Sequence, residues 1–203
     1  MKIAYGDLIG GVSGDMFVAA LLDLGLPLDK LRSDLRKIPT LKFELKIVKK
    51  HVHSIRATQL KVVCAKNEAP RSWKQIRELI QRSKLGAEIK AIGGEIFTCL
   101  AQAEAKIHGV AVDKVHFHEV GATDSIVDIM AAAIGVRELG IDVFHFSRIP
   151  LGRGISASQH GPLPVPGPAT LEILRGLPVF GVDIESDFTP EYVIIRGKGK
   201  IIA

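Results

Sequence analysis

The amino-acid sequence predicts an α/β or α+β protein in which helices pack on a mixed sheet that contains a β-hairpin. Three observations lead to this fold class. Apolar and polar residues alternate over the neighbouring segments 41–49 and 54–64, which is typical of half-buried strands. Other segments repeat apolar residues with the helical period. Extended and helical segments also alternate along the chain without an internal repeat, so we expect a single domain over residues 1–203.

The elements of the N-terminal half follow from these patterns and from the positions of glycine and proline. We expect a strand at 2–6, helices at 15–24 and 29–38, and a hairpin over 41–64 that turns near residues 51–54. Ser13 stands where a residue capping the first helix would be, and Gly25 and Pro27 end that helix.

The C-terminal half alternates in the same way. We expect helices at 73–81, 87–108, 125–139 and 169–175, strands at 143–149 and 177–183, an extended segment at 115–118, and a polar, glycine-rich loop at 151–161. Ser72 can cap the helix that follows it. Gly93 and Gly94 cost about 1 kcal/mol each inside a helix, so the pair predicts close packing against another element.

Composition excludes several classes of protein. The 203 residues can bury a sizeable core without disulfides, so we expect Cys64 and Cys99 to be reduced thiols. No apolar run reaches the ~18 residues of a membrane helix, and the N-terminus lacks an apolar leader, so we expect no membrane partner and a cytoplasmic protein. The net charge of +5 suits an anionic substrate, whereas no basic stripe interleaved with aromatic residues indicates a nucleic-acid partner.

Residues 115–128 read VHFHEVGATDSIVD and contain the densest group of metal-ligating side chains. If the segment 115–118 is extended, His116 and His118 share one face because alternate side chains of a strand point the same way. Glu119 follows directly. Imidazole together with carboxylate suits nickel, zinc, iron or manganese. Solvated histidines beside a turn remain the alternative interpretation.

Two carboxylates lie at the start of the following helix. Asp124 and Asp128 are four residues apart and therefore share one face of that helix. They could complete a metal or acid/base site. Alternatively, Asp124 only caps the helix, where the helix dipole favours an acidic residue. Asp128 interrupts an apolar run, where a carboxylate needs a partner if it is buried.

Two further segments could bind a substrate. Residues 10–15 (GGVSGD) form a glycine turn that carries Ser13, Gly14 and Asp15 into a helix, and such a turn can approach a nucleotide-like substrate or its metal. A tight turn with a Ser13 cap is the alternative. Arg153, between two glycines, could bind a carboxylate or phosphate, and His160 could add a ligand or carry a proton.

The remaining histidines have simpler interpretations. His51 and His53 lie at the expected hairpin turn and are expected to be solvated. His108 follows the end of a helix, where a cation favours the helix dipole. His145 lies in an apolar strand and is assigned to the core or the surface. The chain contains no G-x-S-x-G, H-E-x-x-H or C-x-x-C pattern, so nucleophilic hydrolysis and structural zinc have no support.

Four segments in order resemble one known family. They are GVSGDMF (11–17), VHFHEVGATDSIVD (115–128), PLGRG (150–154) and HGPLPVP (160–166). This set resembles the N-terminal part of the nickel insertion proteins of nickel-pincer cofactor biosynthesis, the LarC family, from about residue 3 to residue 190.

The resemblance implies insertion of Ni²⁺ into pyridinium-3,5-bisthiocarboxylate mononucleotide, a lyase-type reaction that forms the nickel-pincer nucleotide used by lactate racemase. It implies that CTP and Mn²⁺ or Mg²⁺ are required. Carried over by position, it implies metal ligands at His116, His118, Glu119, Asp124 and Asp128, and catalytic carboxylates at Glu119, Asp124 and Asp128. The family motifs also cover Ser13, Gly14, Asp15, Arg153 and His160 without giving their roles, and we expect these residues to bind the cofactor.

The chain departs from the family pattern in three places. Residues 65–70 contain no histidine where many members have a histidine-rich loop, and Thr189-Pro190 continues as Glu191 rather than as T-P-T-G. The family's C-terminal domain, which is associated with CTP, is not part of this sequence. Either a separate chain supplies it, as we expect, or the gene is truncated, or the chain is a homologue with another task. A metallochaperone or cofactor-binding module without chemistry, and a structural homologue that binds neither ligand, remain alternatives. The sequence leaves homo-oligomerisation open.

Overall fold

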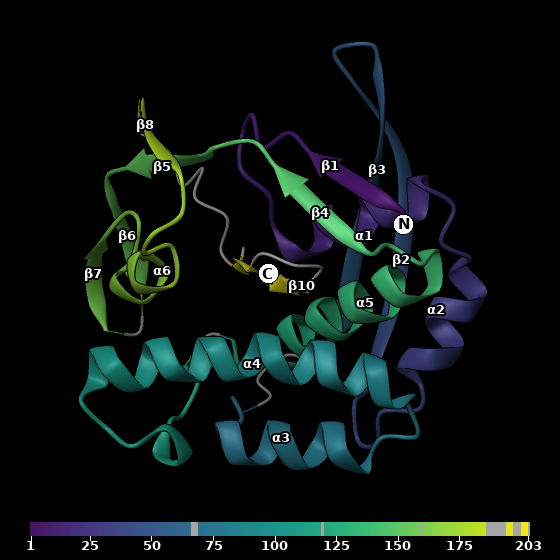
Figure 1. Ribbon diagram of the computed structural model, residues 1–203, viewed down its shortest axis with the longest axis horizontal. Coiled ribbons are helices and arrows are strands. Elements are labelled where there is room, and N and C mark those ends of the chain that lie inside the picture. The colour runs from purple at the N-terminus through teal and green to yellow at the C-terminus, as the bar shows by residue number, and fades with distance from the viewer. Residues whose placement is uncertain (66–68, 119, 159, 186–193, 197–199, 203) are drawn as a thin grey trace.

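The computed structural model describes residues 1–65, 69–118, 120–158, 160–185, 194–196 and 200–202. Helices combine with small parallel and antiparallel sheets (Figure 1), which confirms the predicted mixed class with its hairpin. The helices are α1 (Gly14–Asp23), α2 (Leu28–Leu35), α3 (Trp73–Arg82), α4 (Ala87–His108), α5 (Thr123–Leu139) and α6 (Pro168–Ile173), with a 3-10 turn, η1, at Val112–Lys114. The strands are β1 (Ile3–Gly6), β2 (Phe43–Val52), β3 (Ile55–Cys64), β4 (Val143–Phe146), β5 (Ile149–Arg153), β6 (Ile155–Ser158), β7 (Gly161–Pro164), β8 (Val179–Glu185), β9 (Ile194–Arg196) and β10 (Lys200–Ile202).

Within the described residues, the strands form two-stranded pairs. β1 pairs with β4 and β5 with β8 in parallel, whereas β2–β3, β6–β7 and β9–β10 are antiparallel. The β2–β3 hairpin turns where it is predicted to, at His53 and Ser54, which both have positive φ and are exposed. Two such residues match the right-handed twist of the strands that they join.

The segment 151–161, predicted as a loop, instead contributes to β5, β6 and β7. Pro162 and Pro164 lie within β7 and argue against a strand in the sequence, because proline lacks the N–H that a sheet uses. The β6–β7 pair has only edge strands, where the missing N–H costs least. The glycine-rich motif therefore becomes a hairpin.

The main hydrophobic core surrounds α5. This helix is apolar on nearly all sides and is buried from Ile126 to Val136 apart from Asp128. Gly93 of α4 lies against it as predicted, because an added Cβ there would be 2.5 Å from the sulfur of Met130. Gly94 has open space at that position, so only one glycine of the pair serves the contact.

Asp34 is a buried carboxylate beside the main core whose charge is paired. Asp34 of α2 is buried and accepts hydrogen bonds from Lys30 and from Lys37, the latter at 2.6 Å. Burial raises the pKa of Asp34, but these two hydrogen bonds outweigh it and hold the pKa below its ordinary value. The pair of lysines therefore keeps a charged carboxylate on the helix beside the core.

A second, smaller core includes residues of β5 and of the segment after α6, two elements that lie on the left of Figure 1 above α4. Its buried members are Leu8, Ile149 and Leu174. Lys106 of α4 donates to Glu172 of α6 at 2.6 Å and ties this part to the main one. The described residues thus form a large core and a small one, and α4, which lines the large core, also contacts α6.

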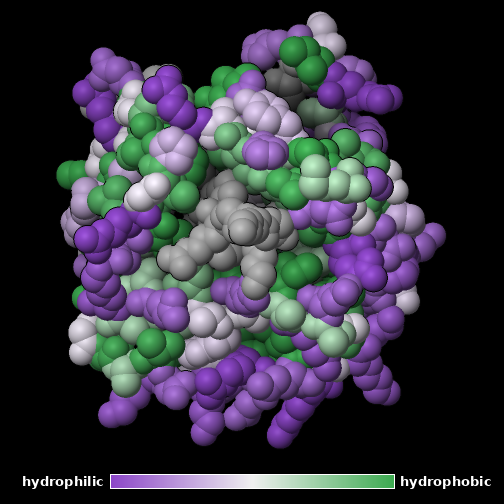
Figure 2. Space-filling view, in the orientation of Figure 1, coloured by the Kyte–Doolittle hydropathy of each residue, from purple (hydrophilic) through white to green (hydrophobic). Residues whose placement is uncertain are grey.

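The surface agrees with the predicted amphipathic pattern. Figure 2 shows hydrophilic side chains along the lower edge of this face, where α3 exposes its polar side. The opposite side of α3 buries Trp73, Ile76, Leu79 and Ile80. Ser72 and Gln75 form a reciprocal capping box at its start, as the position of Ser72 predicts. Across the described residues, the helices lack the combination of length and apolar character that a membrane span requires.

Candidate metal centre

The segment 115–118 is anchored by alternate side chains. Val115 and Phe117 are 2% and 1% exposed, whereas His116 and His118 are exposed, so the predicted alternation is confirmed. The Phe117 ring lies 6.2 Å from that of Phe97 on α4. The backbone N–H of Trp73 donates to the Val115 carbonyl at 3.0 Å. Because Val115 and Phe117 are buried, the side chains of His116 and His118 on the opposite face of the segment point toward solvent.

Gly121 fixes the turn that leads into α5. The backbone N–H of Arg71 donates to the Gly121 carbonyl at 3.1 Å. A Cβ on Gly121 would lie 2.6 Å from the Arg71 nitrogen and 2.8 Å from the Phe117 carbonyl oxygen. Because these are backbone atoms, they cannot swing aside as a side chain can. The motif needs glycine here for close approach of two chain segments.

His108 comes from the last turn of α4. Gly109 ends the helix in the left-handed conformation, with φ of 64°. The His108 Nε2 lies 3.2 Å from a carboxylate oxygen of Glu104, one turn earlier. A carboxylate that holds one ring nitrogen orients the imidazole and leaves Nδ1 for another partner. The sequence interpretation assigned His108 to the helix end alone.

His160 comes from the turn between β6 and β7. Its backbone N–H donates to the Ser158 hydroxyl at 3.1 Å, and that hydroxyl donates to the Gly161 carbonyl at 2.8 Å. Gly161 has φ of 90°, which favours glycine. Local hydrogen bonds thus shape the turn that presents this imidazole.

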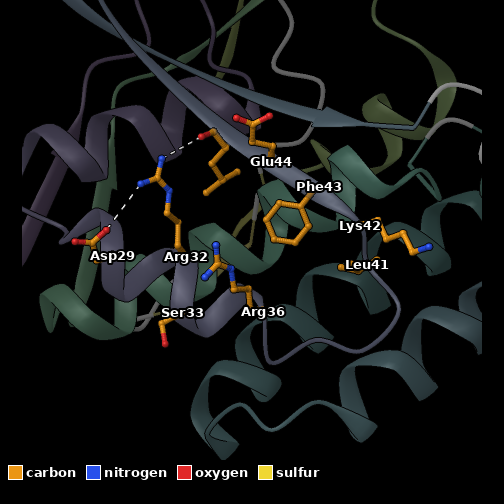
Figure 3. A pocket seen from close by; sticks show the side chains of 9 residues that line it. Asp29, Arg32, Ser33, Arg36, Leu41, Lys42, Phe43 and Glu44 are labelled. Atoms are coloured by element: carbon orange, nitrogen blue, oxygen red, sulfur yellow. Dashed lines mark hydrogen bonds and ion pairs between the residues drawn. The ribbon is translucent and has the colours of Figure 1, made fainter.

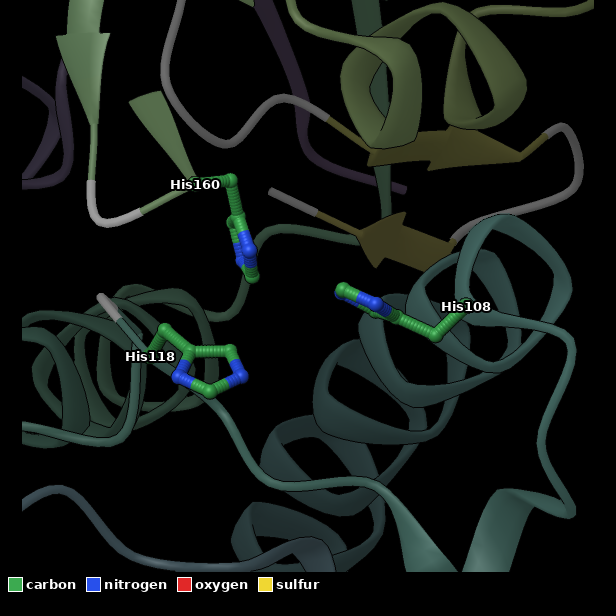
Figure 4. Close-up of side chains that lie close together, drawn as sticks. All are labelled: His108, His118 and His160. Carbon is green, nitrogen blue, oxygen red and sulfur yellow. The ribbon is translucent and has the colours of Figure 1, made fainter.

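The three histidines converge from these separate elements (Figure 4). The ring centroids are 4.7 Å apart for His118 and His160, 5.0 Å for His108 and His160, and 6.0 Å for His108 and His118. One nitrogen from each ring lies within 4.8 Å of the others. Nitrogen ligands about 2 Å from a shared tetrahedral metal are ~3.3 Å apart, so small side-chain rotations would close the site.

The cluster opens into a pocket of about 660 Å³. Helix α4, the start of α5, the β6–β7 hairpin and α6 all contribute to its wall. Glu104 and Asp124 bring carboxylates to the pocket, and Ser125 brings a hydroxyl. The pocket is large enough for an organic ligand beside a metal ion.

Asp124 lies in the wall of this pocket, whereas two other predicted ligands, His116 and Asp128, lie outside the cluster. His116 forms an isolated backbone bridge with Ser72 and is not part of the three-histidine cluster. Asp128 lies against Gly14, where an added Cβ would be 2.9 Å from the Asp128 Cβ. The GVSGD and VHFHEVGATDSIVD motifs therefore meet at Asp128. Glu119 lies outside the described residues.

The remaining predicted binding residues have local partners. Ser13 occupies the N-cap of α1, but its hydroxyl donates to the Asp15 carboxylate and accepts no N–H of the helix, so the expected side-chain cap does not form. The same Asp15 oxygen accepts the Met16 N–H at 2.8 Å. Arg153 is 60% exposed and lies 2.8 Å from Asp183. It is not part of the wall around the histidine cluster.

A second pocket, of about 880 Å³, lies between α2 and β2 (Figure 3). It carries the cations of Arg32, Arg36 and Lys42. Arg32 donates to the Leu45 carbonyl at 3.2 Å and lies 3.8 Å from Asp29. None of the predicted site residues that the structure describes contributes to its wall.

Comparison with known proteins identifies the family. One relative, 46% identical over 93% of the chain and 48% of its own length, is the "Pyridinium-3,5-bisthiocarboxylic acid mononucleotide nickel insertion protein" of Geobacillus kaustophilus. A protein of the same name from Desulfitobacterium hafniense is 44% identical over 92% of the chain and 46% of its own length. A "Putative nickel insertion protein" of Citrifermentans bemidjiense is 45% identical over 88% of the chain and 47% of its own length.

The chain thus spans about half the length of the curated relatives that it matches. No solved structure matches it. The family model described as "Nickel insertion protein" matches residues 4–194, nearly the whole chain. The chain therefore belongs to the nickel insertion protein family.

Proposed function

We propose that this chain is the nickel-binding part of a protein that inserts nickel into pyridinium-3,5-bisthiocarboxylic acid mononucleotide. The family and the names of two relatives support the reaction. The observation that carries the proposal is the convergence of His108, His118 and His160 beside a pocket large enough for an organic ligand. The use of CTP with Mn²⁺ or Mg²⁺, a separate C-terminal chain, the formation of the cofactor of lactate racemase and a cytoplasmic location belong to the same proposal.

The three imidazole donors suit a metal ion that is bound first and then transferred to a substrate. Imidazole nitrogens bind Ni²⁺ well, but sulfur of a thiocarboxylate is a softer donor that can compete for it. The three histidines are exposed, so a substrate can approach the ion without unfolding its surroundings. The cluster would therefore hold nickel until the two sulfur atoms of the substrate take it.

Formation of the metal–carbon bond releases a proton from the pyridinium carbon. Asp124, a carboxylate in the wall of the same pocket, is our candidate to accept it. Asp128 lies against Gly14, in the turn where the Ser13 hydroxyl donates to the Asp15 carboxylate. We propose that this turn holds Asp128, and through it the start of α5, in place.

Calorimetric titration with Ni²⁺ tests the ligand set. We expect His108→Ala, His118→Ala and His160→Ala each to weaken nickel binding by at least about tenfold, because each removes one ligand from a three-ligand site. His116→Ala is the matched control, since it removes an exposed imidazole from the same segment. The motif alone assigns His116 as a ligand, whereas the geometry favours His108. If His116→Ala weakened nickel binding while His108→Ala and His160→Ala left it unchanged, the proposed three-histidine site would be contradicted.

A carrier without chemistry would use the same cluster. The exposure of all three histidines is the observation that favours it, because an exposed site suits transfer to another protein. Incubation of the nickel-loaded chain with substrate, CTP and a full-length relative lacking its own histidine cluster separates the two functions. Several turnovers per chain support insertion, and a single stoichiometric transfer supports a carrier.

A further inference from the structure

The pocket beside the histidine cluster has an unusual charge for a protein that handles an anion. Among the described residues of its wall there is no lysine or arginine, whereas Glu104 and Asp124 each bring a carboxylate. The rest of the wall is histidine, hydroxyl-bearing and apolar side chains, including Leu100, Val120 and Ile173. Without an added cation, this pocket repels negative charge.

Two cations on elements near the pocket, Lys106 and Arg153, are already paired with carboxylates. Lys106, on the helix that carries His108, binds Glu172 at 2.6 Å. Arg153 binds Asp183 at 2.8 Å and does not contribute to the wall. The described pocket that is rich in cations, around Arg32 and Arg36, is the other one (Figure 3). The family's substrate, a mononucleotide with two thiocarboxylates, carries several negative charges and finds no lysine or arginine among the described residues of this wall.

We propose that metal binding is the switch that admits the anionic substrate, so that nickel binds first and the mononucleotide second. This inference rests on the proposed function. A dication held by the histidines reverses the sign of the local potential and supplies the counterion that the wall lacks. The order also protects the site, because an empty pocket rejects the substrate until nickel is available to be inserted.

The experiment measures binding of two probes, pyridine-3,5-dicarboxylate and nicotinate mononucleotide, by calorimetry with and without saturating Ni²⁺. We expect Ni²⁺ to tighten both probes by at least about tenfold in the parent chain. The double variant His118→Ala/His160→Ala should show no such gain. Asp124→Asn should bind both probes more tightly than the parent when metal is absent, because it removes one repelling charge. Asp113→Asn is the matched control, since it makes the same change at an exposed residue paired with Arg77.

The outcomes separate this inference from the proposed function. Ni²⁺ binding to the parent chain and to each variant is measured separately, before the probe titrations. If Ni²⁺ fails to bind the parent or binds the double variant equally well, the proposed metal site is wrong. If Ni²⁺ binds the histidines but the probes bind as tightly without it, only the order of binding is overturned. Equal effects of Asp124→Asn and Asp113→Asn would also overturn it, since the repulsion would not be specific to the pocket.

Discussion

The two hydrophobic cores support the three histidines unequally. His108 and His118 come from segments whose neighbours, such as Phe97 and Phe117, are fully buried in the large core. His160 comes from the β6–β7 hairpin, in which no described residue is buried. Two of the proposed ligands are therefore positioned by dense packing and the third by hydrogen bonds within a turn. The comparison indicates a rigid half-site and an adjustable one, which a metal ion would join.

The largest expected effect on stability comes from adding one methyl group beside the large core, compared with the same addition in the β6–β7 hairpin. Gly121→Ala places a Cβ against backbone atoms of Arg71 and Phe117, so we expect it to lower the free energy of unfolding by about 3 kcal/mol. Gly161→Ala meets no atom within 4 Å and suffers only from its positive φ, at a cost of about 1 kcal/mol. Urea denaturation of both variants measures the two costs.

The order of these two costs is the informative result. If Gly161→Ala destabilises the protein as much as Gly121→Ala does, the hairpin contributes to the main folding unit and the contrast between the two parts is wrong. Nickel titration of Gly161→Ala adds a second readout, because this variant alters the turn that presents His160 while leaving the segment of His118 unchanged.

The second expected effect is that nickel ties the two parts together. A ligand at 100 times its dissociation constant stabilises the folded state by about 2.7 kcal/mol, and this applies to the parent chain. We further expect slower hydrogen exchange at the backbone amides of β6 and β7 when nickel is bound, because the ion links their turn to α4. Hydrogen exchange followed by mass spectrometry measures this protection.

His160→Ala provides the comparison for the exchange experiment. This variant retains His108 and His118, so residual nickel at saturating concentration should protect the end of α4 but not the hairpin. Equal protection of the hairpin in the parent and in His160→Ala would show that the ion does not bridge the two parts.

The same contrast explains how much could be predicted from the sequence. Packing patterns are periodic, so the outward direction of His116 and His118 followed from Phe117 between them, and the capping box followed from Ser72 and its position before a helix. The meeting of His108 with His160 depends on how α4 and the β6–β7 hairpin are placed in space, and no local pattern records it. The Glu104–His108 spacing of one helical turn was the available signal for His108.

The strands around Arg153 were missed for a different reason. Proline and glycine argue against a strand in general, but in a two-stranded hairpin both edges tolerate them. The Ser13 cap was predicted wrongly because the hydroxyl donates to the charged Asp15 carboxylate, two residues later, and its oxygen accepts no N–H of the helix in this orientation. The strand pairing of β6 with β7 and the hydrogen bond of Ser13 to Asp15 therefore depend on a partner that the residue type alone does not specify.

The smallest expected effect tests whether the rigid half-site is already optimal. Gly94→Ala meets no atom within 4 Å, so the gain in helix propensity should raise the free energy of unfolding by up to about 1 kcal/mol. The matched control for this variant is Gly93→Ala, because the same change one residue earlier would place the Cβ 2.5 Å from the Met130 sulfur. Because Met130 is flexible, the steric cost of this contact exceeds the gain in helix propensity only moderately, and we expect a net loss of about 1 kcal/mol. Urea midpoints measure both changes, and nickel affinity should stay the same in Gly94→Ala because His108 lies at the far end of α4. A Gly94→Ala protein that is more stable but binds nickel less tightly would show that bending of α4 contributes to the metal site, and the half-site that we describe as rigid would then have to move when nickel binds.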